Sequence, residues 1–201
     1  MKENREIWNR KYLQDKVFVK GGLFEYTTKW VWDIIEHHVK EDIRIKCIDI
    51  GCGDLSFWKY RLFHYRPCKN YIGIDISDFI IKENVKKFPN RQFLNLSSSD
   101  YVEGLSSLVV LCMDLLFHIP DNCVYVNTII NLCEYSKKWI ILSNWHKEPE
   151  KYNTDYQTYR NFDYYQYIFE HYGFKLMTMH KVPINNIGAI YVYKKVDENE
   201  C

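Results

Sequence analysis

Residues 47–56 read Cys47-Ile-Asp-Ile-Gly-Cys-Gly-Asp-Leu-Ser56, a short apolar run that ends in two glycines separated by one residue. The apolar run before Gly51 predicts a buried strand, and the residues after Gly53 can start a helix. Glycines at such a junction let the backbone turn sharply and let a ligand approach closely, while the helix N-terminus offers unpaired amides. Asp49 adds a carboxylate beneath the loop. The stretch predicts a ligand-binding strand–loop–helix unit.

Strands and helices alternate on both sides of this unit. The predicted strands span residues 45–50, 71–76, 92–96, 108–113, 139–143, 174–180 and 189–194. The predicted helices span residues 1–20, 30–39, 56–64, 79–87, 124–135 and 163–172. This alternation predicts an α/β fold, with a doubly wound, mostly parallel seven-stranded sheet and helices on both faces. The most apolar strand, 108–113, is expected at its centre. A short connection with Pro183 and Gly188 predicts a C-terminal antiparallel hairpin.

Composition indicates one cytoplasmic domain over residues 1–201. The 27 basic and 26 acidic residues balance, which disfavours duplex nucleic acid or an anionic membrane as partner. The seven cysteines are odd in number and include no C-x-x-C pair, so we expect reduced, buried thiols rather than disulfides or zinc ligands. The N-terminus has no apolar signal segment, and no run approaches the length of a membrane span. We expect no metal site, and the sequence leaves the oligomeric state open.

The second predicted strand ends in Tyr71-Ile-Gly-Ile-Asp75-Ile-Ser77. An acid at this position in a doubly wound sheet can accept both hydrogen bonds of a ribose diol. Capping of the next helix is the other role that Asp75 could have, although Ser77 or Asp78 fills it more naturally. The ligands of such sheets bind beyond the carboxyl ends of the strands, so each strand end is a place to look for chemistry.

The pattern Asp49-x-Gly51-x-Gly53, followed 26 residues later by Asp75, resembles motif I and the ribose-binding acid of class I S-adenosylmethionine-dependent methyltransferases. The resemblance implies S-adenosylmethionine as cofactor and S-adenosylhomocysteine as product, with the glycine loop under the methionine part. It departs at Leu55, where the family commonly has a third glycine. The cofactor-binding residues that we expect are Tyr12, Asp49, Gly51, Cys52, Gly53, Asp75, Ile76, Ser97, Ser98 and Met113.

Two further regions extend this resemblance. Trp8-Asn-x-x-Tyr12 is similar to the leading helix of these enzymes, which closes over the cofactor, so residues 1–40 are expected to form an N-terminal helical cap. After the third strand the family usually has an acid that binds the adenine amino group. Here Ser97 occupies that position and Asp100 follows three residues later, so the residue that contacts adenine stays open, and a polar turn is the alternative.

The fourth strand continues into Leu111-Cys-Met-Asp114-Leu-Leu-Phe-His118, which resembles a Leu-Asp-Val-x-x-His-Leu segment of small methyltransferases. Asp114 ends the strand where the resemblance places the methyl group, and His118 is expected one helical turn later on the same side. Asp114 is a candidate general base or orienting group, and His118 a candidate proton relay. The alternatives are a capping role for Asp114 and a packed, hydrogen-bonded role for His118.

A long segment, residues 144–162, follows the fifth strand and is predicted to be a substrate lid. We expect Trp145, Tyr156 and Arg160 to bind the substrate, with His146 as a further candidate base. Arg160 belongs to an Arg-x-Phe segment similar to one in the same methyltransferases, and its guanidinium can pair with a carboxylate or phosphate. Stacking of Arg160 on a tyrosine in a surface loop is the alternative.

The sequence therefore predicts a methyltransferase for a small polar acceptor, with O-methylation of a sugar or glycan precursor as the working hypothesis. Three other classes stay open. A catalytically inactive binding or regulatory subunit is compatible with Leu55 and Ser97. A nicotinamide-dependent oxidoreductase would need Gly-x-Gly-x-x-Gly, in which Ser56 replaces the third glycine. An RNA methyltransferase would need a local basic groove.

Overall fold

The computed structural model describes residues 2–14, 25–58, 70–149, 156–182 and 187–196. Its strands are β1 (Lys46–Ile50), β2 (Asn70–Asp75), β3 (Gln92–Asn95), β4 (Ser107–Cys112), β5 (Ser136–Trp145), β6 (Phe174–Lys181) and β7 (Gly188–Lys195). The α-helices are α1 (Lys2–Gln14), α2 (Glu25–Ile45), α4 (Asp78–Lys87), α5 (Asn122–Tyr135) and α6 (Gln166–His171). Short 3-10 turns are η2 (Ser56–Trp58), η3 (Leu116–His118) and η4 (Phe162–Tyr165).

The strands form one seven-stranded sheet in the order β3-β2-β1-β4-β5-β7-β6. β1 pairs in parallel with β2 and β4, and β4 pairs in parallel with β5. β7 runs antiparallel to both of its neighbours, β5 and β6. The expected fold class is confirmed, including the central position of β4 and the C-terminal antiparallel hairpin. Four of the five residues of β1 are buried, as a strand covered on both faces requires.

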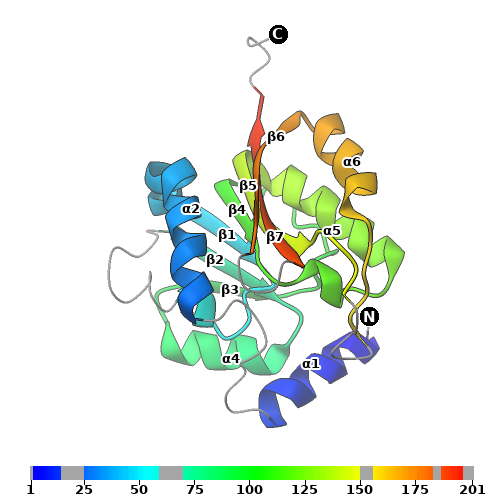
Figure 1. Cartoon of the computed structure of the whole chain (residues 1–201). Helices are drawn as coiled ribbons and strands as arrows, with labels where there is room; N and C mark the ends of the chain where they lie inside the picture. The colour runs from blue at the N-terminus through cyan, green and yellow to red at the C-terminus, as the bar shows by residue number, and fades with distance from the viewer. Residues whose placement is uncertain (1, 15–24, 59–69, 150–155, 183–186, 197–201) are drawn as a thin grey trace.

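Helices cover both faces of the sheet (Figure 1). α2 and α4 pack on one face, where Val31, Ile35 and Ile80 join the apolar core. α5 and α6 pack on the other face, whose core includes Ile129 and Phe169. α1 lies away from both layers, beside α4 and across one end of the sheet (Figure 1).

Several elements differ in extent from the sequence-based prediction. α2 is longer, with a non-helical residue at Val39 (φ −130°, ψ 19°), because apolar residues continue to bury on both sides of that kink. β5 runs to Trp145, so the first two residues of the predicted lid belong to a strand. The predicted helix 56–64 begins as the 3-10 turn η2, and residues 59–64 lie outside the described residues, as do 15–20 and 150–155.

The start of α4 settles which residue caps it. The Ser77 hydroxyl accepts a hydrogen bond from the Ile80 amide (3.2 Å), which is the N-cap interaction. The Asp75 side chain is therefore not needed as the cap of this helix. Among the described cysteines, four are free and buried, as expected, but Cys123 is exposed at the first turn of α5, so the expectation of buried thiols does not hold for it. Within the described residues, no helix combines the length and apolarity that crossing a membrane requires.

Candidate cofactor and acceptor site

The glycine loop folds back onto the end of β2. The amides of Gly51 and Cys52 both donate to the Ile74 carbonyl, at 2.8 and 3.0 Å. Gly51 (φ +78°) and Gly53 (φ +54°) have left-handed backbones that favour glycine. A Cβ at position 51 would lie 3.0 Å from the Leu115 side chain, so the loop backbone approaches its neighbours closely.

The Asp75 carboxylate accepts hydrogen bonds from two backbone amides. Oδ2 accepts from Gly53 at 3.0 Å, and Oδ1 accepts from Ser77 at 2.9 Å. Burial raises the Asp75 pKa to about 6, although these amide bonds favour the charged form. Each carboxylate oxygen has a second lone pair, so Asp75 retains the capacity to accept from a ligand.

Asp49 supports the loop from beneath. Its Oδ2 accepts from Trp58 Nε1 (2.6 Å) and from the Tyr71 hydroxyl (2.9 Å), and the side chain is buried. Burial raises the pKa of Asp49 to about 6. The structure thus brings Asp49 into contact with side chains under the loop, which favours a positioning role.

Leu55 occupies the place of the third glycine and has the left-handed backbone conformation that favours glycine. Its φ is +62°, a region that costs a branched side chain about 1–2 kcal/mol. The side chain is buried in the same apolar cluster as Trp58 and Val31. The departure from the family pattern is therefore accommodated by packing the leucine into the core, at the cost of backbone strain.

The turn after β3 is closed by its own side chains. The Ser97 amide donates to Asp100 Oδ2 (3.0 Å), and the Ser98 hydroxyl pairs with Thr128 Oγ1 (2.7 Å). Asn131 Nδ2 donates to the Ser98 carbonyl at 2.9 Å. These contacts fix the polar turn against α5, and Oδ2 of the Asp100 carboxylate accepts from the amide of Ser97 itself.

Helix α1 covers the glycine loop. The Tyr12 hydroxyl lies where a Cβ at Gly53 would approach it to 3.1 Å. Burial, and then the charge of Asp75, raise the Tyr12 pKa well above its usual value. Asn9 binds the start of α4 by accepting from the Ser77 hydroxyl (2.7 Å) and donating to Asp78. Asn9 lies inside the Trp8-Asn-x-x-Tyr12 motif, but nothing in that motif distinguishes it as a functional residue.

Asp114 and Ser143 form a reciprocal pair at the ends of β4 and β5. The Asp114 amide donates to Ser143 Oγ (2.6 Å), and Ser143 Oγ donates to Asp114 Oδ1 (2.8 Å). Asp114 is half-buried and has φ +52°, and Met113 beside it is buried. The sequence did not single out Ser143, whose partner lies 29 residues away.

His118 does not stand one α-helical turn beyond Asp114. The left-handed backbone of Asp114 redirects the chain, and Leu116–His118 forms a 3-10 turn instead. Rings surround the imidazole, with the Trp8 centroid at 5.1 Å and the Tyr156 centroid at 5.6 Å. Its buried Nδ1 has no hydrogen-bond partner among the described residues. Burial, and then the Lys11 charge, lower the His118 pKa to about 3.

The residues at the end of β5 and just after it lie in two different places. Trp145 stacks on Phe117, with centroids 4.6 Å apart and planes at 5°, and thus lies next to the His118 turn. The His146 amide donates to the Ile187 carbonyl (2.8 Å), which places this residue beside the strand β7. Burial, and then the Lys181 and Lys147 charges, lower the His146 pKa.

Arg160 is bound to the segment that follows η3. Its guanidinium donates to the carbonyls of Ile119 (2.7 Å) and Pro120 (2.6 Å) and to Asn122 Oδ1 (2.9 Å). It also lies over the Tyr125 ring, 4.4 Å from the centroid. Of the two roles that the sequence allows for Arg160, the structure shows the guanidinium stacked on a tyrosine. This geometry favours a structural role over anion binding.

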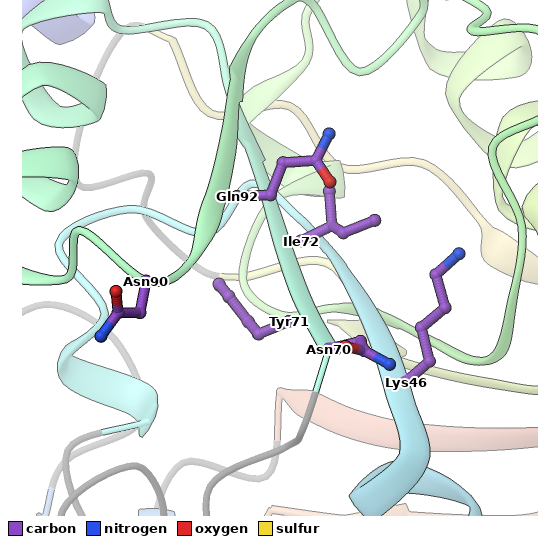
Figure 2. Close-up of a pocket in the computed structure, with 6 residues that line it drawn as sticks. All are labelled: Lys46, Asn70, Tyr71, Ile72, Asn90 and Gln92. Atoms are coloured by element: carbon purple, nitrogen blue, oxygen red, sulfur yellow. The ribbon is translucent and has the colours of Figure 1, made fainter.

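A separate hollow of about 330 Å³ lies at the other end of the sheet. Figure 2 shows its lining residues at the amino ends of β1, β2 and β3, among them Lys46, Asn70 and Gln92. The glycine loop and Asp75 lie at the carboxyl ends of these strands, so this hollow is distinct from the candidate site. Among the described residues, no group of three or more His, Cys, Asp or Glu side chains is arranged to bind a metal ion.

The strand order, the antiparallel β7 and the glycine loop beside an acid at the end of β2 define the fold of class I S-adenosylmethionine-dependent methyltransferases. The sequence matches no protein-family model and no curated protein. Magnesium protoporphyrin IX methyltransferase (ChlM) from Synechocystis PCC 6803, solved with bound S-adenosylhomocysteine, has a similar structure. The TM-score is 0.72 at 15% identity, over 97% of this chain and 99% of that one.

Two other solved structures share the fold. CalS10, an amino pentose methyltransferase from Micromonospora echinaspora with bound S-adenosylmethionine, gives a TM-score of 0.70 at 10% identity, over 94% and 97% of the two chains. The [4+2]-cyclase SpnF gives 0.68 at 9% identity, over 88% and 84%. The resemblance inferred from the sequence is confirmed at the level of the fold.

Proposed function

We propose that this chain is an S-adenosylmethionine-dependent methyltransferase acting on a small polar acceptor. The observation that supports the proposal most is the glycine loop joined to the Asp75 carboxylate by the Gly53 amide. A buried acid at the end of β2, with acceptor capacity remaining, suits a ribose diol. The close backbone approach at Gly51 suits the methionine part of the cofactor. Solved structures of similar fold contain this cofactor or its product.

We assign the proposed cofactor contacts by their place around this loop. Tyr12 covers the loop from α1, and Asp49 positions it from beneath. The remaining proposed contacts are Gly51, Cys52, Gly53, Asp75, Ile76, Ser97, Ser98 and Met113. When bound, the cofactor supplies an electrophilic methyl group on a sulfonium, and the C–S bond that breaks leaves its electron pair on sulfur.

Asp114 is the proposed base. An acceptor hydroxyl forms the new C–O bond with an oxygen lone pair, and its proton passes to the Asp114 carboxylate, which Ser143 orients. His118 stays neutral at physiological pH because its pKa is lowered to about 3, so it does not repel a sulfonium cation. Its Nδ1 has no hydrogen-bond partner among the described residues but is shielded from solvent, so it can accept a hydrogen bond from the acceptor only when the surrounding rings move. His146, beside β7, is the second candidate base.

A sugar or glycan precursor is the acceptor that we propose. The rings of Tyr156, Trp145 and Trp8 lie close to His118 or to its neighbour Phe117, and aromatic faces of this kind suit sugar rings. CalS10, of similar fold, is itself a methyltransferase for an amino pentose. Arg160 would reach the acceptor only by giving up its present carbonyl contacts. We propose a cytoplasmic location, without a membrane or nucleic-acid partner.

Transfer of an isotope-labelled methyl group to a panel of sugars and nucleotide sugars tests this proposal. Label in product with the wild-type chain, lost by about 100-fold or more in Asp114→Ala, is the expected result. Asp33→Ala, at an exposed position of α2, is the matched control. Turnover that is unchanged in Asp114→Ala would remove Asp114 from the mechanism.

A binding or regulatory protein without methyl transfer is the second candidate. The strained Leu55 in the loop favours it, and so does the missing acid at Ser97. SpnF illustrates that this fold also occurs in a protein described as a cyclase. Tight binding of S-adenosylhomocysteine without label transfer to any member of the panel would support this candidate.

A further inference from the structure

Helix α1 presents two neighbouring stripes of side chains to two parts of the site. Arg5, Asn9 and Tyr12 follow one another at i, i+4 and i+7, so they share one stripe. Trp8 and Lys11 are spaced at i, i+3 and lie on the adjacent stripe. The first stripe contacts the residues around Asp75, and the second covers the imidazole of His118.

The first stripe is anchored by Asn9. Its Oδ1 accepts from the Ser77 hydroxyl (2.7 Å) and from the Phe79 amide (3.3 Å), and its Nδ2 donates to Asp78 Oδ1. The amide of the same Ser77 donates to the Asp75 carboxylate. Ser77 therefore connects the carboxamide of Asn9 with Asp75, the acid that we assign to the ribose.

Arg5 makes a second connection to the same strand end. Its guanidinium donates to Asn95 Oδ1 at 3.1 Å. Asn95 Nδ2 in turn donates to the carbonyls of Asp75 (3.1 Å) and Ile76 (3.0 Å). Asn9 and Arg5 thus each bind a residue, Ser77 or Asn95, that is itself hydrogen-bonded to Asp75. Both contacts require α1 to be docked.

The second stripe closes the acceptor side. The Trp8 ring meets His118 edge to face at 5.1 Å and Tyr156 at 5.8 Å. The Lys11 ammonium lies 4.0 Å from the Tyr156 centroid. His118 is half-buried in this arrangement, and its Nδ1 is shielded from solvent without a hydrogen-bond partner among the described residues, so the solvent exposure of this nitrogen reports whether α1 is docked.

We propose that Asn9 is a positioning residue that couples the two halves of the site, because its bonds to the start of α4 hold Trp8 and Lys11 over His118. A ligand that stabilises the Asp75 region then favours docked α1 and assembles the acceptor side, which is a coupling between two sites. The identity of that ligand rests on the proposed function. The dependence of the His118 environment on Asn9 does not.

The test is a pH titration of the histidines by NMR in the full chain, with 13C label at Cε1 and His118 assigned from a His118→Gln variant. In the ligand-free wild type, burial and the nearby Lys11 charge keep the His118 pKa near 3. Asn9→Ala should raise that pKa towards the ordinary 6.5, although the hydrogen bonds of Asn9 go to the start of α4 and not to the imidazole. Leu13→Ala, at a 59% exposed position of the same helix, should leave it unchanged.

A rescue separates positioning from general loss of structure. The double substitution Asn9→Asp with Asp78→Asn exchanges donor and acceptor but preserves the bond between the two side chains, so the low His118 pKa should return. Saturating S-adenosylhomocysteine added to Asn9→Ala should also lower the His118 pKa again, and the variant should bind this ligand about tenfold more weakly.

Three outcomes decide the matter. A wild-type His118 pKa in Asn9→Ala would overturn the role of Asn9. Binding of S-adenosylhomocysteine to Asn9→Ala without a fall in the His118 pKa would overturn the coupling. No binding to the wild type would overturn the proposed cofactor, while the ligand-free comparison would still decide whether Asn9 positions α1.

Discussion

The backbone amide of Gly53 donates to the carboxylate of Asp75 at 3.0 Å, so the glycine loop after β1 is joined directly to the end of β2. The two residues lie 22 positions apart in the chain. Within the described part of the chain the carboxylate bonds amides and no cation, so its charge is available to a ligand with hydroxyl donors. This pair is the structural basis for the cofactor assignment.

Asp75→Asn should weaken binding of S-adenosylhomocysteine by about 10- to 100-fold. The substitution removes a charged acceptor worth about 1.5–3 kcal/mol, and it points an amide NH2 at a donor that the carboxylate now accepts from. Calorimetric titration measures the effect. Asp33→Asn, on the exposed side of α2, is the control, and equal affinity of the two variants would exclude Asp75 from the cofactor site.

Leu55→Gly should be more stable than Leu55→Ala. Both substitutions lose the packing of a buried leucine, but only glycine relieves the strain of the backbone at φ +62°, which costs other residues about 1–2 kcal/mol. Both should be less stable than the wild type, by roughly 2–5 kcal/mol for alanine. Urea unfolding gives the order, and an alanine variant at least as stable as the glycine variant would show that position 55 is not strained.

Asp49→Asn should raise the free energy of unfolding, relative to that of the wild type, more at neutral pH than at acid pH. Burial raises the Asp49 pKa from 3.8 to about 6. The folded wild type is therefore stabilised by the protonated Asp49 carboxyl at low pH, below about 4, and loses that stabilisation as the pH rises through 6. Asparagine keeps the oxygen that Trp58 and Tyr71 bind but does not ionise. The free energy of unfolding of the variant minus that of the wild type should grow by about 2 kcal/mol from pH 4 to pH 7. A difference that is constant over this range would contradict the raised pKa.

Arg160→Gln distinguishes a structural arginine from a substrate-binding one. The guanidinium donates to two carbonyls next to η3, so its loss should lower the free energy of unfolding by about 2 kcal/mol. Anion binding, as the sequence suggests, predicts instead a raised KM for the acceptor with unchanged stability. Urea unfolding and steady-state kinetics of the same variant decide between the two.

The fold could be predicted because its signals are local. The apolar runs at β1 and β4, the glycines at the first turn and the short connection before β7 each act within a few residues. Strand and helix ends were less predictable: β5 continues to Trp145 because pairing with β7 extends it, and that partner lies far along the chain.

The site was only partly predictable, because some of its contacts join residues that are far apart in the sequence. Gly51, Gly53 and Asp75 lie in recognisable patterns, and the structure brings them together. Asn9 acts through Ser77, 68 residues away, and no pattern within the helix indicates that partner. The predicted position of His118, one helical turn after Asp114 on the same side, was wrong. That spacing assumes an α-helix, whereas the positive φ of Asp114 interrupts one.

The most direct test of the central claim is a calorimetric titration of the purified, ligand-free chain with S-adenosylhomocysteine, with S-adenosylmethionine and NADH in parallel. We predict binding of the two S-adenosyl compounds and no binding of NADH, with affinity for the S-adenosyl compounds that falls in Asp75→Asn. Binding of NADH alone, or no binding by a chain shown to be folded, would contradict it.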